Sequence, residues 1–378
     1  MQGISRGPKA IGRKLRALTT QIVVQGAAIA LPRAYTRLNK LDIVQFGIRG
    51  AILPFRVRTL KEARGPAPGA DDVVVLSVLR NGLPWLDTFL SHHRALGARR
   101  FIILDNGSTD GSREYLMSQD DVVLLASNAP YRHYENTFKR YICDRFAKGR
   151  WCLFVDVDEL VAYPGMSQRS LADLARFTWE SGFSAVITQM LDLYSDVPMA
   201  DMPDGTGRDL RVLCRFYETQ DIEWAPYVQR ESNSVPDNAR LHFGGVRSRV
   251  FGTRNCLTKT SLFFNGEGLV PFHRWHHTRN ARLADFSIAL LHYPFNRQYR
   301  EKVLEAAASG RYGWVTSDEY QAYAAVMRDN PRLSMMSEAS RLYQAPEQLV
   351  AERFLEASPS FRQWAGMSNS DYSKQREI

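Results

Sequence analysis

Short apolar segments alternate with amphipathic segments between residues 73 and 155, and this alternation limits the folds that the chain can adopt. Apolar side chains recur every four residues on one helix face, as at Phe138, Ile142 and Phe146. Strands that alternate with helices predict an α/β fold with a mostly parallel sheet and helices on both faces. The segments with the length and composition of buried strands are Val73–Leu79, Phe101–Leu104, Val122–Leu125 and Trp151–Val155.

Linker composition marks a first domain boundary. Residues 64–70 read Arg-Gly-Pro-Ala-Pro-Gly-Ala, and the strand-like pattern starts directly after them. Residues 192–240 are rich in Pro, Gly, Asp and Asn, which predicts a long functional loop. Residues 297–330 have the pattern of two helices. The predicted parts are a basic amphipathic N-terminal arm and linker (1–70), the α/β domain (71–300) and a helical C-terminal extension (301–378).

Positive charge is concentrated in the predicted arm. The chain has 49 Lys or Arg, 40 Asp or Glu, and a net charge of +9. Residues 1–70 contain thirteen basic and two acidic residues, a net charge of +11, which leaves −2 for the remainder. A near-neutral body argues against a nucleic-acid-binding protein whose fold is basic throughout. The four cysteines are too few and too widely spaced for a disulfide scaffold, which suggests a reducing compartment.

The arm has the pattern of a helix at a membrane surface. Its apolar residues recur at helical spacing from Ile11 to Ile22, and basic residues fall elsewhere on the same helix. The apolar run that follows, Ile22–Leu31, is shorter than the roughly 20 residues that span a bilayer. We therefore expect a cytoplasmic protein that docks on the anionic inner membrane through residues 1–64. Packing of the arm on its own domain or on a partner subunit fits the same pattern, and a signal peptide is a weaker alternative.

Polar residues follow three of the predicted strands, where ligands of open α/β sheets bind. Arg80 follows the first strand, Asp105 the second, and Asp156 and Asp158 the fourth. In extended backbone, residues two apart project to the same side, so the carboxylates of Asp156 and Asp158 would converge on one cation. Oxygen ligands of this kind favour Mg²⁺ or Mn²⁺. No Lys or Arg is near this pair in the sequence, which disfavours a local salt bridge, and no GxGxxG or Walker motif is present.

The ordered motifs resemble those of family 2 glycosyltransferases, and most closely the branch that shares its motif series with the family 92 enzymes. The resemblance is dense over about residues 73–160 and looser at 244–251, 257–260 and 290–293. The matching segments are Val73–Asn81, Trp85, Ser91–Gly97, Leu104–Ser112 and Phe154–Glu159.

This resemblance implies a Rossmann-like GT-A fold and an inverting transfer of sugar from a nucleotide-diphosphate donor, usually a UDP-sugar. The acceptor would be a glycan or a lipid-linked molecule in polysaccharide biosynthesis. It further implies that Asp105 contacts the nucleoside and that Asp156 and Asp158 hold Mn²⁺ or Mg²⁺ against the diphosphate. His292 resembles the histidine that completes the metal site, and Gly82 stands where the family has Glu.

Three further residues are candidates for the site. Arg80 could contact the pyrophosphate or cap the helix that follows it. Glu267, in a flexible Asn-Gly-Glu-Gly segment, is the first candidate for the base that an inverting enzyme needs. His277 loosely matches a family histidine and is a secondary candidate, for the acceptor side of the site.

Two other functions fit parts of the sequence. A nucleotidyltransferase could hold a nucleoside triphosphate on a similar sheet, but residues 79–83 lack the expected Gly-rich and basic phosphate loop. A non-enzymatic sugar-binding or membrane-adaptor protein would be consistent with the missing Glu at Gly82. Retention of all three aspartates together with His292 argues against that adaptor.

Overall fold

The computed structural model describes residues 21–24, 27–30, 47–65, 67–69, 71–228, 232–274, 276–309 and 314–367. The chain divides into two units, Met1–Ile48 and Arg49–Ile378. In the first unit, β1 (Gln21–Val24) and β2 (Ala27–Ala30) form an antiparallel hairpin. Ile22, which we expected at the end of a helix, lies in β1. The remainder of that expected helix lies outside the described residues.

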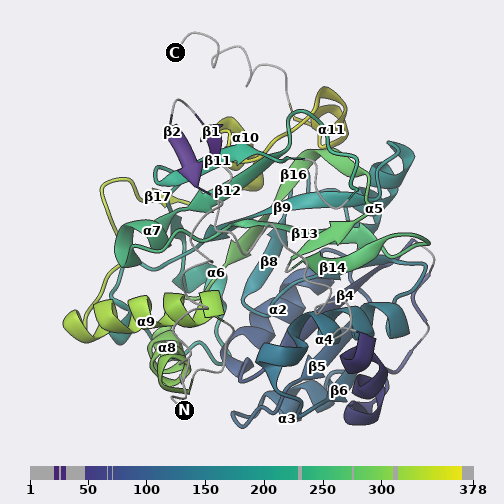
Figure 1. Cartoon of the computed structure of the whole chain (residues 1–378), viewed down its shortest axis with the longest axis horizontal. Coiled ribbons are helices and arrows are strands. Elements are labelled where there is room, and N and C mark those ends of the chain that lie inside the picture. The colour runs from purple at the N-terminus through teal and green to yellow at the C-terminus, as the bar shows by residue number, and fades with distance from the viewer. Residues whose placement is uncertain are drawn as a thin grey trace, which may run out of the picture. The chain divides into compact units, whose positions relative to one another are not determined.

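A nine-stranded sheet forms the centre of the second unit (Figure 1). Its strand order is β3-β6-β5-β4-β7-β13-β9-β16-β8. The strands are β3 (Arg58–Lys61), β4 (Val73–Leu79), β5 (Phe101–Asp105), β6 (Val122–Ala126), β7 (Trp151–Phe154), β8 (Glu159–Ala162), β9 (Ala185–Asp192), β13 (Thr258–Phe264) and β16 (Leu283–His292).

Most strands of this sheet run in one direction, as the sequence predicts. Strands β6, β5, β4 and β7 are parallel neighbours. Strand β13 is antiparallel to both β7 and β9, so β9 has the direction of β7, and β16 is parallel to β9. Only β3, β13 and β8 among these nine strands run the opposite way. The mostly parallel α/β fold is confirmed.

Helices cover both faces of the sheet, because alternate residues of β4 pack into different cores. Val73 and Val75 pack in one core with Phe89 of α2, whereas Val74 packs in the other with Phe138 of α4. No helix in the described part of the chain is both long and apolar enough to cross a membrane. The helices are α2 (Leu83–Ala95), α3 (Ser112–Met117), α4 (Tyr131–Phe146), α5 (Leu171–Glu180), α6 (Leu210–Leu213), α7 (Val246–Phe251), α8 (Arg297–Ser309), α9 (Trp314–Asp329), α10 (Pro346–Ala351) and α11 (Pro359–Trp364), with the 3₁₀ turns η3 (Leu53–Arg56) and η4 (Met199–Asp201).

Small two-stranded sheets occur in the second half of the chain. Part of the stretch expected as a long loop, residues 192–240, folds into η4, α6 and two of these strands. The expected helix pair over 297–330 is present as α8 and α9, which pack with α7 in a third apolar core (Figure 1). The additional strands are β10 (Phe216–Tyr217) with β17 (Arg341–Leu342), β11 (Ile222–Pro226) with β12 (Arg240–Gly244), and β14 (Val270–Arg274) with β15 (His277–Arg279).

The packed core extends beyond the α/β segment expected at 71–300. Strand β3, within the predicted arm, pairs with β6 at the edge of the central sheet. In the predicted C-terminal extension, the ring of Phe361 on α11 stacks on Phe286 of β16, with centroids 3.9 Å apart and planes 4° from parallel. Both rings are buried in the core that holds α2. The segments at both ends are therefore structural parts of the sheet unit.

We expect replacement of Phe361 to destabilise the whole α/β unit. Phe361→Ala removes a fully buried ring and leaves a cavity against Phe286, which should lower the free energy of unfolding by about 3–5 kcal/mol. The exposed neighbour Gln363 provides a control, since Gln363→Ala should change that free energy by less than about 0.5 kcal/mol. Denaturant unfolding of both variants makes the comparison. Equal stability would show that α11 is not part of the cooperative core.

Candidate functional site at the carboxyl edge of the sheet

Strand direction gathers the predicted polar residues at one edge of the sheet. Parallel strands place their carboxyl ends together, and the antiparallel strands β8 and β13 bring their amino ends to the same edge. The polar residues at or directly after these strand ends are Arg80 (β4), Asp105 (β5), Asp156 and Asp158 (β7), Glu159 (β8), Asp192 (β9), Lys259 (β13) and His292 (β16).

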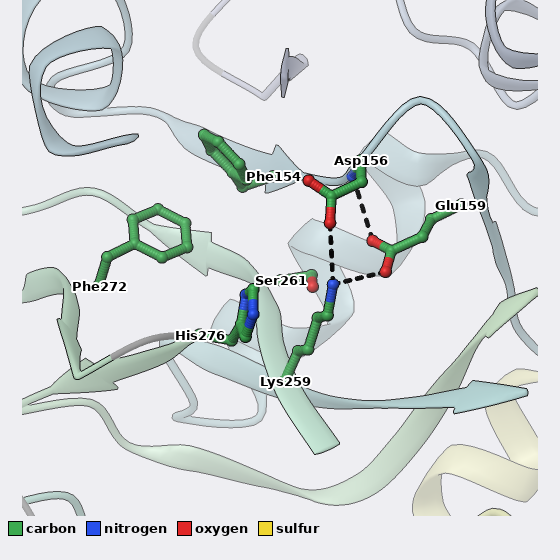
Figure 2. Close-up of a pocket in the computed structure, with 7 residues that line it drawn as sticks. All are labelled: Phe154, Asp156, Glu159, Lys259, Ser261, Phe272 and His276. Atoms are coloured by element: carbon green, nitrogen blue, oxygen red, sulfur yellow. Dashed lines mark hydrogen bonds and ion pairs between the residues drawn. The ribbon is translucent and has the colours of Figure 1, made fainter. Parts of the chain in front are cut away.

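A buried lysine holds the first aspartate of the pair (Figure 2). Lys259 Nζ donates to Asp156 Oδ2 at 3.1 Å and to Glu159 Oε1 at 2.5 Å. Burial alone would lower the pKa of Lys259, but the two carboxylates outweigh it and raise this pKa, so the ammonium stays charged. No basic residue is near the pair in the sequence, but the expectation drawn from this, that Asp156 is not in a salt bridge, is wrong. Lys259 lies about a hundred residues further along the chain, and antiparallel pairing of β13 with β7 brings it back.

The second aspartate faces a different set of partners. His292 lies between two carboxylates, with Nδ1 2.6 Å from Asp192 Oδ1 and Nε2 3.6 Å from Asp158 Oδ2. Lys302 Nζ on α8 is 3.7 Å from the same Asp158 oxygen. Burial alone would lower the pKa of His292, but these carboxylates outweigh it and raise the pKa to about 9. Arg247 balances Asp192 through a buried ion pair of 2.8 Å.

The two aspartates do not converge on one point, because the backbone between them turns. The amide of Glu159 donates to the carbonyl of Asp156 at 3.0 Å, and residues 157–158 form a turn rather than extended chain. This corrects the expectation that both carboxylates project to the same side. Asp156 is directed to Lys259 and Asp158 to His292.

Asp158 and His292 are two side chains at this edge whose spacing comes near that of two ligands of a divalent ion. Two ligand atoms of one such ion lie about 3 Å apart when each is about 2.1 Å from the metal, and Asp158 Oδ2 and His292 Nε2 are 3.6 Å apart. The bond of Nδ1 to Asp192 orients the ring so that Nε2 points to Asp158. With its pKa raised, the ring carries a proton on Nε2, which a metal would have to displace. Among the described residues, no group of three or more His, Cys, Asp or Glu is arranged to hold a metal. The remaining ligands would have to come from substrate phosphate and water, as is common for Mg²⁺.

Asp105 is buried, and both of its carboxylate oxygens are engaged within the chain. Oδ1 accepts from the Ser108 amide at 2.9 Å, and Oδ2 accepts from Arg113 Nη2 at 2.5 Å. Arg113 is partly exposed at this edge, so it connects the buried carboxylate with the surface. Contact of Asp105 with a nucleoside stays a prediction.

Two side chains of the motif Asp105–Ser112 cap the first turn of α2. Ser112 Oγ accepts from the Gly82 amide at 2.9 Å, and Asp110 Oδ2 accepts from the Leu83 amide at 3.0 Å. These amides are therefore not open to a phosphate. Sequence reasoning did not assign this role to Asp110 or Ser112, because the residues that they cap are about thirty positions earlier in the chain.

Arg80 differs from the other residues at this edge because it is exposed and has no ion-pair or hydrogen-bond partner within the described structure. It follows β4 directly and does not cap α2, which was the alternative role expected for it. Beside it, a Cβ built on Gly82 would lie 3.1 Å from Cγ2 of Val157. A Glu side chain at position 82, where the family has Glu, would therefore be crowded by Val157, which lies between the two aspartates.

A small polar pocket lies behind Asp156 (Figure 2), and it includes His276 rather than the predicted His277. Burial and the ammonium groups of Lys139 and Lys259 lower the pKa of His276 and keep its ring neutral. His277 faces away, with Nδ1 3.2 Å from the hydroxyl of Tyr227. The pocket is lined by Phe154, Asp156, Glu159, Lys259, Ser261, Phe272 and His276.

Glu267 lies away from this edge. It is exposed in the loop after β13, whose last residue Phe264 pairs with Trp151 at the start of β7. Asp156 follows the other end of β7, so strand β7 separates the two carboxylates. The antiparallel direction of β13 explains the error, because it takes the following loop to the opposite edge. Glu267 is therefore not the base of this site.

Comparisons with known proteins give a partial likeness. No protein-family model matches the chain. A glycosyltransferase family 92 protein of Oryza sativa subsp. japonica is 27% identical over 110 residues, which are 28% of this chain and 18% of the rice protein. A mannosyltransferase from Pyrobaculum calidifontis, solved in complex with GDP-mannose and Mn²⁺, has 14% identity and a TM-score of 0.28, with 89% of this chain and 93% of that chain covered. This TM-score is too low to align the two sites.

We expect Lys259 to be required for stability, because it balances Glu159 in the interior. Lys259→Met leaves that carboxylate without its cation and should lower the free energy of unfolding by about 3–5 kcal/mol. The surface pair of Lys148 with Asp144 provides a control, since Lys148→Met should cost less than about 1 kcal/mol. Denaturant unfolding at neutral pH measures both. If the two variants were equally stable, the buried ion pair would not be needed for folding.

Proposed function

We propose that this protein is a glycosyltransferase that transfers a sugar from a nucleotide-diphosphate donor to a glycan or lipid-linked acceptor. The observation that supports this most is the Asp158–His292 pair, oriented by Asp192 at the same sheet edge as the free guanidinium of Arg80. The partial likeness to a family 92 glycosyltransferase and the ordered motifs of residues 73–160 support the same class. A UDP-sugar donor and an inverting outcome are proposed from that resemblance.

The charges at this edge suit a departing diphosphate. A divalent ion bound there would neutralise negative charge that develops on the leaving phosphate. Asp158 and His292 would hold this ion, and Asp192 would keep the imidazole in position. Arg80 would bind the diphosphate directly, because a guanidinium forms strong charge-assisted hydrogen bonds with phosphate oxygens. Lys259 would hold Asp156 in place and balance its negative charge.

The nucleoside would lie next to the β4 and β5 ends. Asp105 and Arg113 are joined there, and Arg113 is the member of this pair that reaches the surface. We propose that the two act as a unit, with Asp105 fixing the direction of Arg113 and the pair contacting the nucleoside. His277 remains a candidate on the acceptor side, beside Tyr227.

Loss of Asp158 should abolish metal-dependent transfer. Asp158→Asn keeps the size of the side chain but removes the charge that holds the ion, so sugar transfer should fall by roughly 10²-fold or more. Mn²⁺ binding in the presence of a nucleoside diphosphate should weaken in parallel, as measured by calorimetry. The matched control is Asp237→Asn, at an exposed position outside the site, which should have wild-type activity. Full transfer by Asp158→Asn in EDTA would contradict the metal assignment.

Arg80 should contribute to donor affinity. Arg80→Ala removes one charge-assisted contact to the diphosphate and should raise the donor Kd by about tenfold. Arg99 is also exposed but precedes β5, at the opposite edge of the sheet, so Arg99→Ala should leave this Kd unchanged. Direct titration with the nucleotide sugar distinguishes the two variants. Equal Kd values would remove Arg80 from the donor site.

We also propose that the protein works at an anionic membrane surface, where lipid-linked acceptors are found. The net charge of +11 in residues 1–70 supports this proposal. Removal of residues 1–64 would be a poor test, because it would delete β3 from the central sheet. The residues directly before β3 support a more specific proposal about which side chains contact the membrane.

A further inference from the structure

A large apolar side chain is fully presented to solvent beside the central sheet. Phe55 in η3 is 91% exposed, and Ile52, one helical turn earlier, is 40% exposed. Isolated apolar residues on a surface are ordinary, but here two of them, one of them aromatic, lie one helical turn apart. The ring is therefore available for a partner.

The segment that carries Phe55 is fixed on the sheet. Leu53, two residues earlier, is completely buried in the core that also holds Phe138 of α4. Arg49 donates from Nη1 to the carbonyl of His133 at 2.7 Å, and its guanidinium lies 5.9 Å from the ring centre of Tyr134. Strand β3 follows η3 directly and pairs with β6. Because Leu53 fills the interior position, Phe55 is held outward.

The surroundings of Phe55 are basic. Residues 49–61 contain three arginines and one lysine and no acid. Arg56 and Arg58 follow Phe55 in the sequence and are exposed, and Arg132 is exposed at the start of α4, next to the His133 carbonyl that binds Arg49. The nearest acids in sequence and pairing, Glu62 and Asp120, lie at the far end of β3. An exposed aromatic ring among arginines has the chemistry of a surface that inserts into the headgroups of an anionic bilayer.

This surface lies at the same edge of the sheet as the candidate site. Arg58 pairs with Ala126 at the carboxyl end of β6, and Ala126 pairs with Asp105 at the carboxyl end of β5. A bilayer that contacts η3 would therefore meet the sheet edge where Asp105, Arg80 and Asp158 are found. That arrangement suits an acceptor that is itself anchored in the bilayer.

We propose that Phe55, together with Arg56, Arg58 and Arg132, docks the protein on an anionic lipid surface with the carboxyl edge of the sheet toward the bilayer. The statement that the acceptor is anchored in the bilayer rests on the proposed function, whereas the docking of the protein on lipid does not. A protein partner is a less suitable occupant, because one projecting ring with basic neighbours offers little area for a stable protein interface and complements anionic headgroups in charge.

Vesicle binding by the full chain tests this proposal. The probes are vesicles of phosphatidylcholine alone and vesicles that contain about one third phosphatidylglycerol. Phe55→Ser and the triple variant Arg56→Ala, Arg58→Ala, Arg132→Ala should each reduce binding to the anionic vesicles at least tenfold. The control Val212→Ser removes another exposed apolar side chain, 66% exposed on α6, and should bind as the wild type does. Unchanged binding of Phe55→Ser would overturn the proposal.

Two further readouts separate docking from the other outcomes. Donor binding should be unchanged in Phe55→Ser, so loss of vesicle binding with normal donor affinity supports docking. If the protein proved not to be a glycosyltransferase, the vesicle result would still stand. Light scattering after size exclusion tests for a second copy on this surface. A wild-type dimer that becomes monomeric in Phe55→Ser would overturn lipid docking in favour of self-association.

Discussion

The direction of the strands in the central sheet is the constraint on which the rest of this structure depends. Six parallel strands end at one edge, and the antiparallel strands β13, within the sheet, and β8, at its side, begin there. Side chains separated by more than two hundred residues, from Arg80 to His292, are thereby brought to one surface. The same rule places Glu267 at the opposite edge and η3 with Phe55 at the site edge.

Compensation of buried charge then shapes the site. Carboxylates at this edge would be costly to bury alone, and each has a cation from a different element: Lys259 for Asp156 and Glu159, and Arg247 for Asp192. This pairing divides the acidic motif between two roles. Asp156 becomes part of a structural ion-pair network, while Asp158 faces His292 and Lys302 and is the aspartate that we propose as a metal ligand. The network explains how a cluster of acids can be stable at this edge of the sheet.

Ion pairs also connect the candidate site with helices α7 and α8. Lys302 reaches Asp158 from α8, and Arg247 reaches Asp192 from α7. Helices α7, α8 and α9 share an apolar core, so movement of this group would alter the partners of both aspartates.

The sequence by itself determined the parallel half of the sheet and the polar residues that follow its strands. A mostly apolar run of this length, such as Val73–Leu79, favours a buried strand, and ligands of open α/β sheets bind beyond the carboxyl ends of such strands. The antiparallel strands β3, β8 and β13 were not predicted, because they are short or carry polar residues such as Lys259 that hide the pattern. One signal was available, since the single lysine among the apolar and hydroxyl side chains of residues 257–264 requires an acidic partner when buried. Only the tertiary structure could decide which acid that partner is, and that Asp156 and Asp158 face different cations, because ion pairing depends on distances between segments a hundred residues apart.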